Sequence, residues 1–287
     1  MLQKRPIALA APLDKGAALR LRLLSILVLT PFVLVMIAIG GYAWLATILI
    51  AGILAGWEFF LLSERIGYQP SMVLGLLWIE LLILQGFGGP ADILRPLLAA
   101  LLLCSLMWSL LQDRKSAVAD WALTVAGALY LGGLLSHFIS LRELPDGLRW
   151  LLLPMVSVWV GDGGAYLVGM TAGRHKLWPR LSPKKTWEGT IGGFVFTIVA
   201  ALAFGAACRQ WAPQSAVAQM GWGHTVLLGA LLGPLALGGD LVVSLFKRLA
   251  GAKDSGNLIP GHGGMLDRTD SLLLTIPLAY YWVLFVV

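Results

Sequence analysis

Long apolar runs fill almost the whole chain, and they constrain its fold more than any other feature. Nine such runs follow one another, separated by short polar, glycine-rich or proline-containing breaks. A transmembrane helix needs about 20 mostly apolar residues to cross the hydrocarbon core of a bilayer. With 58% hydrophobic residues, 13% charged residues and a mean hydropathy of +0.82, most of the chain is unsuited to the surface of a soluble domain.

The expected fold is therefore an all-α polytopic integral membrane protein with about nine transmembrane helices. The predicted spans are residues 23–39, 43–62, 72–87, 93–111, 117–141, 150–170, 189–207, 225–249 and 272–287. The third and ninth runs are short for a bilayer about 30 Å thick, so eight spans is the alternative count. We divide the chain into a basic N-terminal segment (1–22), a helical scaffold (23–149) and a C-terminal region (150–287) that carries most of the polar motifs.

The distribution of basic residues predicts the orientation, because Lys and Arg near helix ends favour the cytoplasmic side. With the N-terminus placed in the cytoplasm, 17 basic residues fall inside and only four fall outside. The four outside residues are Arg95, Arg142, Arg149 and Arg209. The net charge of +6 is thus explained by topology and by attraction to anionic headgroups or phosphates, and no nucleic-acid-binding module is visible. We expect a multi-pass protein of the cell (inner) membrane.

Four carboxylates lie within or at the ends of the apolar runs: Glu58, Glu80, Asp162 and Asp240. Each costs several kcal/mol in hydrocarbon unless it faces protein, water or a cation. For Asp162 and Asp240 we favour a functional role over burial against a backbone group or a lysine. Glu58 is balanced between the two interpretations, and Glu80 is assigned no role.

The predicted helix 225–249 carries a polar face. Asp240, Ser244, Lys247 and Arg248 stand at positions i, i+4, i+7 and i+8, which places them along one side of the helix. A carboxylate, a hydroxyl and two cations in this order suit a metal-bound polyphosphate that enters from the cytoplasm. The alternative is the ordinary basic end of a transmembrane helix.

Residues 251–270 are too rich in glycine and charge to continue a span, and they predict a structured loop. Its glycines at positions 256, 261, 263 and 264 would let the backbone approach a ligand closely, as loops that bind phosphate do. Asp267 and Asp270 at the start of the last span are either helix-capping residues or Mg²⁺ ligands together with Asp240. Capping and ligation need not exclude each other.

Two blocks of this sequence resemble the phosphatidate cytidylyltransferase family, in the order and at the separation typical of that family. The first block consists of Asp162, Tyr166, Gly173, Lys176, Ser182, Lys184, Lys185, Thr186, Trp187, Glu188 and Gly189. The second consists of Ser244, Lys247, Arg248, Lys253, Asp254, Pro260, Gly261, His262, Gly263, Gly264, Asp267, Arg268, Thr269 and Asp270. The chain departs from the family pattern at Val243, where relatives often carry an acid, and at Gly163, where a small hydroxyl residue is more common.

The resemblance implies an enzyme that transfers CMP from CTP to phosphatidic acid and releases pyrophosphate, with Mg²⁺ and possibly a second cation. It implies catalytic roles for Asp162, Asp240, Lys247 and Asp267, and metal binding by Asp240, Asp267 and Asp270. The implied substrate-binding residues are Ser182, Lys184, Lys185, Arg248, Lys253, His262, Gly263, Gly264 and Arg268. It also implies a homodimer in the bilayer with the site at the cytoplasmic ends of the C-terminal helices.

Two other functions compete with this one. A CTP-dependent polyprenol or lipid kinase would transfer the γ-phosphoryl group and release CDP instead of pyrophosphate. An ion-coupled transporter would also place acids and glycine or proline breaks within its spans. The transporter alternative leaves the composition of the loop 251–270 unexplained.

Overall fold

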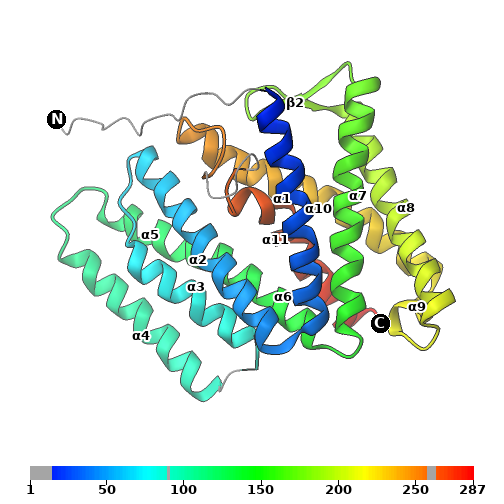
Figure 1. Cartoon of the computed structure of the whole chain (residues 1–287). Helices are drawn as coiled ribbons and strands as arrows, with labels where there is room; N and C mark the ends of the chain where they lie inside the picture. Colours follow the sequence, from blue (N-terminus) through cyan, green and yellow to red (C-terminus); the bar gives the residue numbers. More distant parts are fainter. Residues whose placement is uncertain (1–14, 89–90, 257–262) are drawn as a thin grey trace.

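The computed structural model describes residues 15–88, 91–256 and 263–287, and these ranges are almost entirely helical (Figure 1). The first half contains α1 (Lys15–Ile39), α2 (Gly41–Ile66), α3 (Met72–Gly86), α4 (Ala91–Leu110), α5 (Ala117–Ala128), the π-helical turn η1 (Leu129–Gly133) and α6 (Leu134–Glu143). The second half contains α7 (Gly147–Thr171), β1 (Lys176–Trp178), β2 (Ser182–Thr186), α8 (Trp187–Trp211), α9 (Ala216–Gln219), α10 (Trp222–Leu249) and α11 (Leu266–Phe285).

The predicted all-α fold is confirmed, and several of its helices are apolar enough to be candidate membrane spans. Among the described residues, six helical segments are long and apolar enough to cross a bilayer: Gly41–Ile66, Ile93–Leu110, Ala117–Glu143, Gly147–Thr171, Trp187–Trp211 and Trp222–Leu249. Leu27–Ile39 and Met72–Gly86 are shorter apolar helices. Nine crossings therefore remain a prediction. Two helices extend N-terminally beyond the predicted spans, since α1 begins at Lys15 and α11 begins at Leu266.

The earlier start of α11 changes the setting of two acids. Asp267 and Asp270 lie within the first two turns of this helix, whereas the predicted span began at residue 272. Their spacing of three residues therefore places both side chains on neighbouring positions of one helical surface. The helix begins where it does because partners from α2 and α10 bind its first residues, as described below.

A short antiparallel hairpin, which the sequence analysis did not predict, joins α7 to α8. Lys176 pairs with Thr186, and Trp178 pairs with Ser182. Glu188 in the first turn of α8 holds the start of this connection, since its carboxylate accepts hydrogen bonds from the backbone N–H groups of Arg174 (3.1 Å) and His175 (3.2 Å). The hairpin thereby places the lysines of β2 at a defined position.

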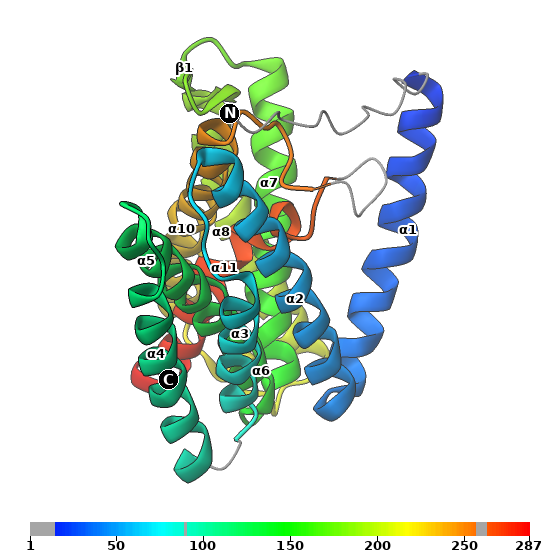
Figure 2. The same ribbon diagram turned by 90° about the vertical axis from the view of Figure 1, so that its left-hand side faces the viewer.

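The segments that connect the helices lie at the two ends of the bundle (Figures 1 and 2). The connections 66–72, 110–117 and 171–187, together with residues 249–256 and 263–266, lie at one end, which we call the basic end. At the opposite end, Arg142 Nε donates to the carbonyl of Ile37 (2.8 Å), and the guanidinium of Arg209 lies 3.6 Å from the centre of the Trp222 ring. Contacts within the protein thus hold these two arginines at the opposite end.

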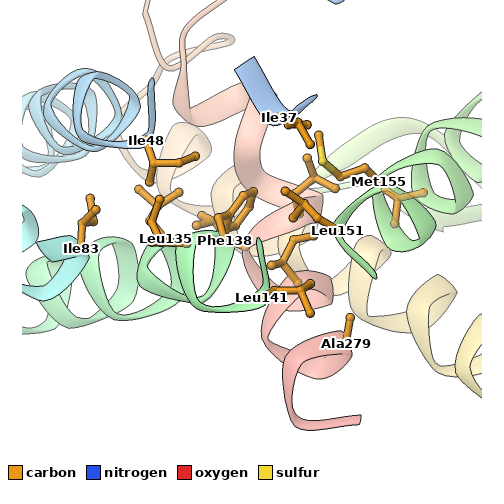
Figure 3. Packing of buried hydrophobic residues seen from close by; sticks show 14 of the residues in the cluster. Ile37, Ile48, Ile83, Leu135, Phe138, Leu141, Leu151, Met155 and Ala279 are labelled. Atoms are coloured by element: carbon orange, nitrogen blue, oxygen red, sulfur yellow. The ribbon is translucent and has the colours of Figure 1, made fainter. Parts of the chain in front are cut away.

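The interior of the bundle joins its two halves. Side chains of α2, α3 and α6 meet those of α1, α7 and α11 in one apolar cluster that includes Ile48, Leu135, Phe138, Leu151 and Ala279 (Figure 3). The indole N–H of Trp44, on α2, donates to the carbonyl of Phe138, on α6 (3.0 Å). Because lipid tails are themselves apolar, such close packing and hydrogen bonding hold membrane helices together better than hydrophobicity alone.

Glycines let α7, α8 and α10 approach one another closely. A Cβ atom at Gly193 of α8 would lie 2.9 Å from the Cβ of Ala165 on α7. A Cβ atom at Gly233 of α10 would lie 2.7 Å from the ring of Phe194 on α8. Small residues at helix crossings are typical of membrane proteins, since they allow backbone contact. These three helices therefore form a compact unit below the hairpin.

The α7–α8 contact makes a prediction about two neighbouring glycines. A Cβ atom at Gly161 would collide with the hydroxyl of Thr197, which is buried, whereas a Cβ atom at Gly163 meets nothing within 4 Å. We expect Gly161→Ala to destabilise the fold by about 1–3 kcal/mol through overpacking. Gly163→Ala is the matched control and should be neutral or slightly stabilising, because alanine favours the helix. Thermal denaturation of the detergent-purified variants, followed by tryptophan fluorescence, measures the difference, and equal midpoints would contradict it.

Candidate active site

A cavity of about 580 Å³ opens at the basic end between α7, α8, α10 and β2. Its charged lining residues are Asp162, Lys176, Lys184, Lys185 and Asp240. The rest of the wall is largely apolar or glycine-rich, and includes Val158, Tyr166, Met170, Phe194 and Leu237. The cavity thus combines a charged region with an apolar one.

The first charged cluster joins the hairpin to α10. Lys185 Nζ lies 2.5 Å from Asp240 Oδ2, and the two side chains are 27% and 31% exposed. Ser244, one helical turn further along the same face of α10, donates its hydroxyl to Asp240 Oδ1 (3.2 Å). Asp162 of α7 lies within electrostatic range of both Asp240 and Lys185. The structure therefore brings together Asp162, Lys185 and Asp240, which belong to separate segments of the sequence.

The second charged cluster joins α10 to α11 and is more deeply buried. Lys247 Nζ lies 2.5 Å from Asp267 Oδ1, and the two side chains are only 11% and 9% exposed. The other oxygen, Asp267 Oδ2, accepts hydrogen bonds from Ser255 N (2.7 Å), Ser255 Oγ (2.9 Å) and Gly264 N (3.2 Å). Asp267 is thus held by one cation and three further donors, which offset the cost of burying its charge.

The two clusters adjoin each other through α10 and α11. A Cβ atom at Gly239 would collide with the backbone carbonyl of Asp270, so the helices touch at the residue that precedes Asp240. Asp270 in turn lies within electrostatic range of Asp240, Lys247 and Asp267. Its Oδ1 atom accepts a hydrogen bond from Ser271 N (2.6 Å). Acids from α7, α10 and α11 therefore converge on one region of the basic end.

This donor set fits Mg²⁺ only in part. Within the described residues, no three His, Cys, Asp or Glu side chains are grouped as a complete metal site. Mg²⁺, however, is usually bound by one or two carboxylates together with substrate phosphates and retained waters. Carboxylate oxygens of Asp240, Asp267 and Asp270 match this preference for hard ligands. The residues present therefore fit a Mg²⁺ ion whose coordination shell is completed by substrate phosphates. The identity of the metal ligands stays a prediction.

The remaining predicted residues lie in different surroundings. Lys184 lines the cavity, and Arg268, on α11, lies within electrostatic range of Asp162. Arg248 instead donates to the carbonyls of Leu181 (3.0 Å) and Ala252 (3.1 Å), and so ties the hairpin to the end of α10. Of the others, Ser182 opens β2, Lys253 is exposed beyond the end of α10, and His262 lies outside the described residues.

Glu58 is the residue whose importance the sequence analysis left undecided. Its carboxylate, on α2, is 2% exposed and accepts hydrogen bonds from Ser255 Oγ (2.7 Å), Met265 N (2.9 Å) and Leu266 N (2.9 Å). It therefore binds the first backbone amides of α11. The signal in the sequence was an acid within an apolar run, but its partners lie about 200 residues away along the chain.

Two glycines of the loop lie against the carboxylate of Glu58. A Cβ atom at Gly256 would lie 2.5 Å from Glu58 Oε1, and one at Gly264 would collide with the same carboxylate. These glycines make room for a side chain of the protein, and ligand binding by Gly264 stays a prediction. Gly263 adopts a left-handed backbone conformation (φ 80°), which favours glycine. Gly261 lies outside the described residues.

The two lysine–carboxylate pairs differ in burial, and this difference predicts different effects on stability. Lys247→Met leaves a buried carboxylate without its cation, which typically costs about 3–5 kcal/mol. Lys185→Met removes the more exposed pair and should cost about 1 kcal/mol or less. Thermal denaturation of the two variants beside the wild-type protein provides the measurement. Equal losses in both variants would contradict the structural difference between the pairs.

Comparison with known proteins places the chain in a family. Residues 20–286 match the model of the Cytidylyltransferase family. A phosphatidate cytidylyltransferase of Synechocystis sp. is 34% identical over 278 residues, which covers 86% of this chain and 90% of the relative. One of Bacillus subtilis is 36% identical over 216 residues, covering 74% of this chain and 77% of the relative. Because both the family model and these relatives extend across most of its length, this chain belongs to the cytidylyltransferase family.

Proposed function

We propose that the protein is a phosphatidate cytidylyltransferase, which transfers CMP from CTP to phosphatidic acid. The observation that carries this proposal is the convergence of Asp162, Asp240, Asp267 and Asp270 with Lys185 and Lys247 beside a cavity that also has an apolar wall. Both substrates are polyanions, and one of them is a lipid. The names of the Synechocystis and Bacillus relatives support the same reaction.

The reaction exchanges one phosphoanhydride linkage for another. A phosphate oxygen of phosphatidic acid attacks the α-phosphorus of CTP, and the bond from that phosphorus to the bridging oxygen of the β-phosphate breaks. CDP-diacylglycerol forms, and pyrophosphate leaves with the bonding electron pair. The protein supplies no covalent nucleophile in this scheme. Its task is to bring two anions together in line and to neutralise the charge that develops on the leaving group.

The charged residues divide this task between them. Asp240, Asp267 and Asp270 would hold Mg²⁺, which neutralises phosphate oxygens of the nucleotide when bound. Lys185 and Lys247 already lie 2.5 Å from carboxylates, so each is positioned to share its charge with a phosphate that enters beside its partner. Asp162 then orients Lys185 from the α7 side, and Lys184 and Arg268 bind phosphates at the rim.

The cavity gives each substrate its own route. Tyr166 and Met170 of α7 line it and are largely exposed on the outer surface of the helix. A lipid can therefore enter laterally from the bilayer while its phosphate meets Lys184 and Lys185. CTP reaches the same charged region from water at the basic end.

We further propose that this end faces the cytoplasm and that the protein resides in the inner membrane. A homodimer stays a prediction from the family resemblance.

The proposed reaction makes a direct prediction about products. Detergent-solubilised protein should release pyrophosphate from CTP only when both phosphatidic acid and Mg²⁺ are present. Asp240→Asn and Asp267→Asn should lower this rate by at least about 100-fold, because each removes charge that is needed in the transition state. Asp113→Asn, an exposed acid in the connection between α4 and α5, is the control and should keep the wild-type rate.

The products also separate the alternatives. Release of CDP instead of pyrophosphate would identify a lipid kinase. Solute flux in vesicles that is lost in Asp240→Asn, without any turnover of CTP, would identify a transporter. Wild-type rates in both aspartate variants would refute the assignment of the site.

The proposed orientation predicts which side of the membrane is accessible at each end of the bundle. In a variant with Cys104 and Cys208 replaced by serine, we expect Lys253→Cys to react with a membrane-impermeant maleimide in inverted vesicles and not in intact spheroplasts. Glu143→Cys, at the opposite end, should show the reverse pattern. Labelling of both positions from the same side would contradict the topology.

A further inference from the structure

Glu58 connects the N-terminal half of the bundle to the second charged cluster. It is on α2, and the described partners of its carboxylate are all hydrogen-bond donors from the segment that precedes and begins α11. Oε1 accepts from Met265 N, and Oε2 accepts from Leu266 N and from the hydroxyl of Ser255. With 2% exposure, this carboxylate depends on those donors in place of water.

The hydroxyl of Ser255 lies between two carboxylates. Its Oγ atom is 2.7 Å from Glu58 Oε2 and 2.9 Å from Asp267 Oδ2. Asp267 Oδ2 also binds the backbone N–H groups of Ser255 and Gly264. Glu58 and Asp267 therefore hold the same short stretch of backbone from opposite sides. A displacement of Ser255 would alter the hydrogen bonds of both acids.

The surrounding glycines show that the local packing is built around Glu58. Side chains at positions 256 and 264 would occupy the space of its carboxylate, as the Cβ contacts above show. A simple cap for α11 would require only the bonds to Met265 and Leu266. The additional bond to Ser255 and the close contact with Gly256 extend the role of Glu58 to the other side of the loop.

We propose that Glu58 is a positioning residue that fixes the orientation of Asp267 through Ser255 without itself touching substrate. Its consequence for catalysis rests on the proposed function, because Asp267 is assigned there to Mg²⁺. Residues that orient metal ligands through hydrogen bonds typically contribute about 10- to 100-fold to metal affinity or activity. The scaffold half of the bundle thereby contributes directly to the geometry of the site.

The first test measures geometry independently of activity. Amide hydrogen exchange of the full-length protein in detergent is resolved to single residues by fragmentation mass spectrometry. Glu58→Gln places an NH₂ group against one of two backbone N–H donors, so exchange should accelerate at Met265 and Leu266, and also at Ser255 and Gly264, whose amides bind Asp267. Glu80→Gln is the matched control, because Glu80 is also an acid within an apolar helix, and it should leave all four amides unchanged.

Ser255→Ala separates positioning from helix capping. This variant keeps Glu58 and its bonds to α11, so exchange at Met265 and Leu266 should stay slow, while exchange at position 255 and at Gly264 should increase. It also provides the test if Glu58→Gln does not fold. Acceleration confined to Met265 and Leu266 in Glu58→Gln, together with unchanged exchange in Ser255→Ala, would overturn the proposal and leave Glu58 as a helix cap.

The second test follows the dependence of pyrophosphate release on Mg²⁺. Glu58→Gln and Ser255→Ala should each raise the Mg²⁺ concentration for half-maximal rate by about 10- to 100-fold, and the double variant should be no worse than the more affected single variant. A merely structural defect lowers the maximal rate without shifting this concentration, and that result would overturn the proposal. If the wild-type protein releases no pyrophosphate while the exchange pattern holds, the proposed function fails and the positioning of Asp267 stands.

Discussion

A carboxylate among apolar helices needs a cation or several hydrogen-bond donors, and this requirement organises the basic end of the bundle. Asp240 is matched by Lys185 and Ser244, and Asp267 by Lys247, Ser255 and Gly264. The two lysine pairs join different elements, since Lys185 links β2 to α10 and Lys247 links α10 to α11. The acids therefore act as the points at which the hairpin, α10 and α11 are fixed to one another.

The same requirement connects the two halves of the chain. Glu58 obtains its donors from the loop before α11, although α2 belongs to the part that the sequence analysis treated as scaffold. One apolar cluster packs α2 and α6 against α7 and α11, the helices that carry Glu58 and its partner Leu266 among them (Figure 3). Scaffold and site are thus less separate than the division at residues 149 and 150 implied.

The position of the cavity relates the architecture to the proposed chemistry. Glycine contacts bring α7, α8 and α10 close together, and the hairpin places Lys184 and Lys185 at the rim of the space between them. A charged region and an apolar wall consequently lie side by side at the end of the membrane-spanning helices. This arrangement suits a reaction between a water-soluble nucleotide and a lipid that keeps its tails in the bilayer.

The sequence by itself determined most of the apolar helices, though not the hairpin of β1 and β2, and it identified most of the charged residues that line the candidate site. Apolar length, helical spacing and the distribution of Lys and Arg are local properties, so the polar face of Asp240 and Ser244 and the concentration of polar motifs after residue 158 were readable without coordinates. Only the tertiary structure decided that Lys185 pairs with Asp240, that Lys247 pairs with Asp267, and that Gly256 and Gly264 make room for Glu58. The physical reason is that a charged residue within an apolar run shows in the sequence that it needs a partner. Which residue becomes that partner depends on which helices pack together.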